Sequence, residues 1–132
     1  MKGIILDASL ALEWFSPQAS AEVLAKRQLL EDHVALVPHL WRYEVMNVIA
    51  TWRKRGDISE ADSIWLLNEI FELPFAIVEE GSAEAIVGLA TLHNLSAYDC
   101  AYLSAAMLTG EPLATLDQKP LAVAQDVRVE CV

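Results

Sequence analysis

Four carboxylates stand at the ends of, or inside, segments that are otherwise apolar. They are Asp7 after Gly-Ile-Ile-Leu, Glu44 in Trp-Arg-Tyr-Glu, Asp99 in Ser-Ala-Tyr-Asp and Asp117 in Ala-Thr-Leu-Asp. A charge beside a buried segment needs a partner, and no neighbouring basic residue is an obvious one for Asp7, Asp99 or Asp117. A hard divalent cation held by converging carboxylate oxygens is therefore the partner to expect.

Each acid taken alone also has a simpler explanation. Asp7 and Asp117 could be helix N-caps, and Asp99 could be a first-turn acid placed behind Ser96 and favoured by the helix dipole. Glu44 could pair with a basic neighbour on its own helix. It is the coincidence of all four that favours a shared site.

The elements that must position these acids alternate along the chain. Strands are predicted at residues 2–6, 34–37, 75–78, 113–116 and 127–131. Helices are predicted at 10–15, 19–31, 39–55, 59–73, 82–93 and 96–109, with a short one after residue 117. This alternation predicts an α/β fold whose parallel sheet is covered by helices on both faces.

Ligands in such folds gather at the carboxyl ends of strands. Asp7 and Asp117 each lie one residue past a predicted strand, so their carboxylates share one crevice if those strands are neighbours. Glu44 and Asp99 would have to come in from helices. The sequence does not say whether the topology brings them there.

Composition predicts one domain over residues 1–132, because 55% of the residues are hydrophobic and can bury a core. The apolar runs are too short for a membrane span, and Asp7 interrupts the only stretch that resembles a signal peptide, so we expect a cytoplasmic protein. Cys100 and Cys131 are too few for a disulfide framework or a zinc site.

The formal net charge of −10 is unusual for a nucleic-acid binder. Two predicted helices carry most of the basic residues, namely Lys26, Arg27, Arg42, Arg53, Lys54 and Arg55. They could form a basic rim around an acidic pit. They could equally be the solvated, positively charged ends of helices, and both readings stay open.

Four motifs in this order make the chain resemble a PIN domain, and within that group the VapC ribonuclease toxins of toxin–antitoxin pairs. They are Leu-Asp-Ala-Ser, then Val-Pro-His-Leu-Trp-Arg-Tyr-Glu-Val-Met-Asn-Val, then Leu-Ser-Ala-Tyr-Asp-Cys-Ala-Tyr-Leu, and finally Leu-Ala-Thr-Leu-Asp. The resemblance implies a three-layer α/β/α domain and a Mg²⁺- or Mn²⁺-dependent endoribonuclease. It also implies a homodimer and a VapB-like antitoxin that occupies the active site.

The resemblance carries over residue by residue. The family's metal-binding acids fall on Asp7, Glu44, Asp99 and Asp117, and its small hydroxyl residues fall on Ser9 and Thr115. Our hypothesis makes Asp7 and Asp99 direct metal ligands, while Glu44 and Asp117 bind a second ion or orient water. Ser9 or Thr115 would hold a carboxylate or the phosphate.

The tryptophans at helical phases, Trp14, Trp41, Trp52 and Trp65, are expected in the core or on a dimer surface rather than as base-stacking platforms. A groove around Trp41, Trp52 and Trp65 is the expected docking surface for the antitoxin. The sequence also leaves two other classes of protein open. A non-catalytic PIN-like module that binds RNA or protein is one, and a receiver-like signalling domain, which lacks its usual acid pair here, is the other.

Overall fold

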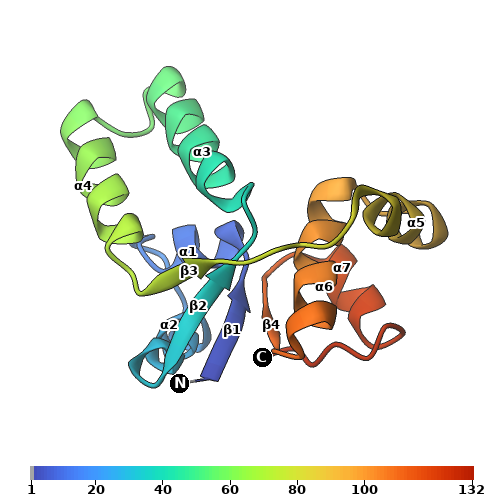
Figure 1. Ribbon diagram of the computed structural model, residues 1–132. Coiled ribbons are helices and arrows are strands. Elements are labelled where there is room, and N and C mark those ends of the chain that lie inside the picture. The colour runs from blue at the N-terminus through green and yellow to red at the C-terminus, as the bar shows by residue number, and fades with distance from the viewer. Residues whose placement is uncertain (1) are drawn as a thin grey trace.

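The computed structural model describes residues 2–132 and has a four-stranded parallel sheet as its centre (Figure 1). The strands are β1 (Lys2–Leu6), β2 (His33–Val37), β3 (Phe75–Ile77) and β4 (Leu113–Ala114), arranged in the order β3-β2-β1-β4. β1, the first strand of the chain, pairs with both β2 and β4 and is therefore an inner strand of the sheet. The predicted parallel α/β sheet is confirmed.

The helices follow the order expected from the sequence. They are α1 (Ala8–Glu13), α2 (Ala21–Arg27), the 3₁₀ turn η1 (Gln28–Glu31), α3 (Trp41–Arg55), α4 (Glu60–Phe71), α5 (Ala83–His93), α6 (Ala97–Thr109) and α7 (Gln118–Ala124). Helices flank the sheet on both sides as a three-layer α/β/α arrangement, and α3 and α4 form an antiparallel pair that projects beyond the strand tips (Figure 1).

Side-chain caps fix where the helices begin. Ser59, Ser82 and Ser96 each accept a hydrogen bond from a backbone amide three residues later, as expected for N-cap serines. Gly56 ends α3 with a φ of 77°, a left-handed conformation that glycine adopts without steric cost. The caps explain why most predicted helix boundaries were correct to within two residues.

The core lies between the sheet and the helices that cover it. Ile5, Leu10, Trp41 and Leu103 are completely buried, and each comes from a different element. None of the helices described in residues 2–132 is both long and apolar enough to cross a membrane.

One predicted strand is wrong. Residues 127–131 form no strand: the chain turns after α7, Arg128 has a φ of 60°, and only Cys131 bridges Leu113. The Val127 amide bonds back to the Val123 carbonyl as in a helix, so the alternating valines are not extended. β4 is also shorter than predicted, which leaves Asp117 three residues beyond its end rather than one.

Candidate active site

The topology brings the ends of four elements to one edge of the sheet. The chain builds β1, β2 and β3 in one direction and then returns to place β4 on the other side of β1. The strand order therefore reverses between β1 and β4, which is where parallel α/β sheets form ligand crevices. Asp7 leaves β1 at this point, and Asp117 lies three residues after β4.

The two helical acids reach the same edge because of the directions of their helices. α3 begins four residues after β2, so Glu44 in its first turn stays near the carboxyl edge of the sheet. α6 packs on β1 and β4 and ends four residues before β4 begins, so its first turn, with Asp99, lies at the opposite, carboxyl end. The sequence alone did not predict that Glu44 and Asp99 would reach the same edge of the sheet.

Asp7 is held by two hydroxyl groups. The Ser9 hydroxyl donates to Asp7 Oδ2 at 3.0 Å, and the buried Thr115 hydroxyl donates to the same oxygen. Thr115 Oγ1 in turn accepts from the Asp117 amide at 3.0 Å. Both predicted supporting residues thus contact the Asp7 carboxylate, and Thr115 connects it to the Asp117 segment.

Glu44 is bonded to a residue that sequence reasoning missed. The Tyr102 hydroxyl, from α6, donates to Glu44 Oε1, and Tyr102 is only 4% exposed. Burial, followed by the charges of Asp7 and Glu44, raises the pKa of Tyr102 so that its hydroxyl stays protonated. The signal was available in the sequence, since Tyr102 lies one helical turn after Asp99 on a largely apolar helix.

The acids are close enough to influence one another. Burial raises the pKa of Glu44, and the charges of Asp7 and Asp99 raise it further, although the Tyr102 hydrogen bond opposes them. Burial also raises the pKa of Asp99, as do the charge of Asp117 and a carboxyl–carboxyl hydrogen bond to it. Neighbouring carboxylates that resist joint ionisation would be relieved by a cation.

The arrangement is not a finished metal cage. Within residues 2–132, no three His, Cys, Asp or Glu side chains are spaced to grip a metal ion as they stand. The donor set nevertheless suits a hard cation, because it consists of half-buried carboxylates with hydroxyl groups behind them.

The simpler readings of single acids also hold in part. Asp7 and Asp117 are the N-caps of α1 and α7, and Asp99 follows the capping Ser96. Asp117 caps with Oδ1, which accepts from the Lys119 amide, whereas both oxygens of Asp7 accept hydrogen bonds. A carboxylate oxygen has more than one lone pair, so capping and ligand binding are compatible. Glu44 pairs with Tyr102 and not with a basic neighbour on its own helix. No ion pair of Glu44 with a basic residue occurs among the described residues.

The basic residues at the end of α3 lie well away from Glu44. Arg53, Lys54 and Arg55 form the last turn of α3, whose first turn holds Glu44. Their distance along the helix axis from Glu44 is roughly 14–17 Å at 1.5 Å per residue. Arg53 approaches Glu60 at 4.0 Å, which fits a solvated helix end better than a rim of the acidic pit.

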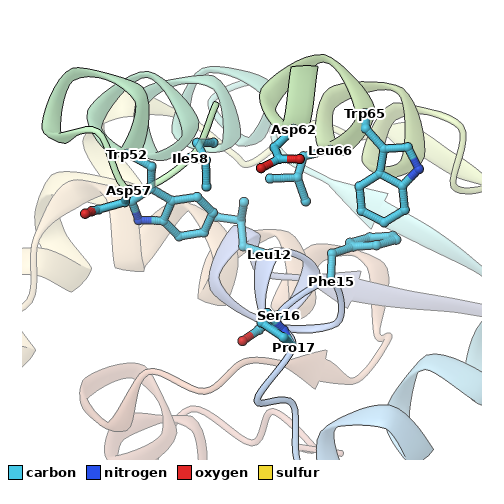
Figure 2. Close-up of a pocket in the computed structure, with 10 residues that line it drawn as sticks. All are labelled: Leu12, Phe15, Ser16, Pro17, Trp52, Asp57, Ile58, Asp62, Trp65 and Leu66. Atoms are coloured by element: carbon cyan, nitrogen blue, oxygen red, sulfur yellow. The ribbon is translucent and has the colours of Figure 1, made fainter. Parts of the chain in front are cut away.

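A groove of about 480 Å³ lies between α1 and the α3–α4 pair (Figure 2). Apolar side chains face one another across it: Leu12 and Phe15 on one side, and Trp52, Ile58, Trp65 and Leu66 on the other. The rings of Phe15 and Trp65 meet edge to face, with centroids 6.0 Å apart. Asp57 and Asp62 supply acidic groups to this lining.

The tryptophans divide between core and groove. Trp14 and Trp41 are buried, and Trp41 packs against Phe71 and Phe75. The expectation that Trp41 lines an exposed groove is therefore wrong, because that face of α3 points into the core. Trp65, by contrast, is 53% exposed.

The chain belongs to the PIN domain family, whose sequence pattern matches residues 4–126. It is 29% identical over 119 residues to Ribonuclease VapC3 of Pyrobaculum aerophilum, covering 88% of this chain and 90% of that protein.

Solved structures share the fold. PAE2754 from Pyrobaculum aerophilum superposes with a TM-score of 0.72 at 22% identity, covering 92% of this chain and 85% of that one. VapBC2 from Rickettsia felis, solved bound to a DNA fragment from their promoter, gives a TM-score of 0.68 at 9% identity over 98% of this chain and 97% of that one.

Replacing Asp99 should change how stability depends on pH. Folding raises the pKa of the Asp99 carboxyl, so the folded state favours its protonated form. The free energy of unfolding therefore falls as the pH rises from about 4, the unfolded pKa, through the raised value. Metal-free Asp99→Asn protein should therefore have a higher free energy of unfolding than the wild type at pH 7 to 8, and the gain should vanish near pH 4.

Urea unfolding in EDTA across this pH range measures the difference. Asp126→Asn removes an exposed carboxylate that lies after α7, and it serves as the matched control. A loss of stability in Asp99→Asn that is the same at every pH would contradict the proposed repulsion.

Proposed function

We propose that residues 1–132 form a single PIN domain that acts as a metal-dependent endoribonuclease, the toxin of a toxin–antitoxin pair working in the cytoplasm. The observation that carries this proposal is the meeting of Asp7, Glu44, Asp99 and Asp117 at the switch point between β1 and β4. Membership of the PIN domain family and the similarity to a ribonuclease support it.

Mg²⁺ or Mn²⁺ is the cofactor that this donor set would hold. Asp7 and Asp99 are the proposed direct ligands, and Glu44 and Asp117 would bind a second ion or orient water. Such an ion lowers the pKa of bound water and neutralises charge that develops on the phosphate. The charge argument matters here, because a chain with a net charge of −10 repels RNA unless its acidic site is neutralised.

The protein's own groups prepare the site for hydrolysis, in which a water oxygen bonds to phosphorus and the bond to the leaving oxygen breaks. Ser9 and Thr115 donate to Asp7 and so fix the direction of its remaining lone pairs. Asp99 and Asp117 must both be ionised to act as ligands, and burial, followed by the charge of Asp117, raises the pKa of Asp99. Activity should therefore fall in acid at a higher pH than ordinary carboxylates would require.

Neutral isosteres of the two direct ligands test the nuclease. Asp7→Asn and Asp99→Asn should each lower RNA cleavage in Mg²⁺ or Mn²⁺ by at least about 100-fold while the proteins stay folded, since each removes a charge that the cation needs. The assay is gel analysis of a pool of structured and unstructured RNAs, with EDTA as a blank.

Asp126→Asn is again the matched control and should cleave like the wild type. Full activity in either ligand variant would sink the residue assignment. Cleavage by none of the proteins, with folding intact, would favour a non-catalytic binding module instead.

The proposed antitoxin would use the groove between α1 and the α3–α4 pair. Its apolar walls suit the apolar face of an amphipathic segment, and Asp57 and Asp62 suit a basic residue on that segment (Figure 2). Trp52 lies eight residues after Glu44 on α3, about 12 Å along the helix axis. A partner seated in the groove could therefore reach the acids with a few more residues and block them with an Arg.

A homodimer is also proposed, as the resemblance implies. Its support is a set of large apolar side chains that α5 and α6 leave exposed, namely Val87, Leu92, Tyr98, Met107 and Leu108.

Truncating the exposed tryptophan tests the antitoxin groove. Trp65→Ala should raise the dissociation constant of the toxin–antitoxin complex by at least about 10-fold, because a half-exposed aromatic residue in an apolar groove is a typical hot spot. Calorimetric titration of the cognate antitoxin into each toxin variant gives the value. Leu24→Ala, an exposed apolar truncation on α2, should leave it unchanged, and equal effects of the two variants would refute this docking surface.

A further inference from the structure

Tyr102 occupies a place where three elements of the proposed site meet. It lies on α6, one turn after Asp99, so the two residues project from neighbouring positions of the same helix face. Its hydroxyl donates to Glu44 Oε1 from α3. The same hydroxyl lies near the backbone of Ala8, the residue that follows Asp7.

The bond restricts a side chain that would otherwise have several rotamers. Glu44 has three side-chain torsions and is only partly buried, so packing alone does not fix its carboxylate. The hydrogen bond engages Oε1 and leaves Oε2 free. Tyr102 itself is held firmly, because it is buried in the interior face of α6 beside Leu103.

We infer that Tyr102 is a positioning residue of the proposed metal site, which commits one oxygen of Glu44 to a hydrogen bond and presents the other to a divalent cation. Ligands in metal sites are commonly oriented in this way by a group behind them. This inference rests on the proposed function. It adds to the four acids, Ser9 and Thr115 a further supporting side chain, which acts on Glu44 as the two hydroxyl residues act on Asp7.

A purely structural role is the competing explanation. Buried tyrosines usually find some acceptor for the hydroxyl, and Glu44 could be merely the nearest one. In that case removal of the hydroxyl would alter stability but not the affinity of the folded protein for a metal ion.

The experiment measures Mn²⁺ binding to the intact protein by electron paramagnetic resonance of the free ion. Tyr102→Phe removes only the hydroxyl oxygen and should raise the Mn²⁺ dissociation constant by about 10- to 100-fold, the usual effect of losing a group that orients a ligand. Tyr43→Phe removes a hydroxyl from a 74% exposed tyrosine on α3, next to Glu44 in the sequence; it is the matched control and should bind like the wild type. Circular dichroism checks that each variant is folded.

A double-mutant cycle separates positioning from general damage. In a Glu44→Ala background the hydroxyl has no carboxylate to orient, so adding Tyr102→Phe should change the dissociation constant by less than about 2-fold. If Tyr102→Phe binds Mn²⁺ with wild-type affinity, or loses the same affinity in both backgrounds, the role of Tyr102 is refuted while the proposed function still stands. Failure of the wild type to bind Mn²⁺ and to cleave RNA would overturn the proposed function as well.

Discussion

The structure depends on keeping four half-buried carboxylates together at one edge of the sheet. Burial makes the ionisation of Glu44 and Asp99 costly, and the charges of neighbouring acids add to that cost, so the pKa values of both are raised. A compact α/β domain has no stability reason to gather acids in this way. Such a cluster persists where function requires it, at the expense of the stability of the metal-free protein.

The fold offsets that repulsion with local hydrogen bonds rather than with basic residues. Asp7 and Asp117 cap α1 and α7, and hydroxyl groups of Ser9 and Thr115 stabilise Asp7. Tyr102 does the same for Glu44. Hydrogen bonds donated to a carboxylate favour its charged form and leave its other lone pairs able to bind a cation. A salt bridge from Lys or Arg would neutralise the acids and compete with a cation.

Local sequence signals predicted most of the elements but not the meeting of the acids. Serine caps, the Gly56 stop and the apolar periodicity act over a few residues, and their predictions hold. The position of β4 beside β1 depends on long-range pairing, and the sequence left it open as the condition for Asp7 and Asp117 to share a crevice. The strand expected at 127–131 does not form. An alternating pattern does not show whether the neighbouring strand, here the two-residue β4, is long enough to pair with it. Tyr102 was missed because a tyrosine at a helical position reads as core until its hydroxyl is seen to meet Glu44.

Anomalous scattering from a crystal soaked in Mn²⁺ tests the central claim most directly, because it locates the ion without relying on activity. The account predicts a peak beside the carboxylates of Asp7 and Asp99, at the edge of the sheet where β1 and β4 end, with Glu44 facing it. A soaked crystal with no peak there, or with manganese bound only at other carboxylates of this acidic chain, would contradict it.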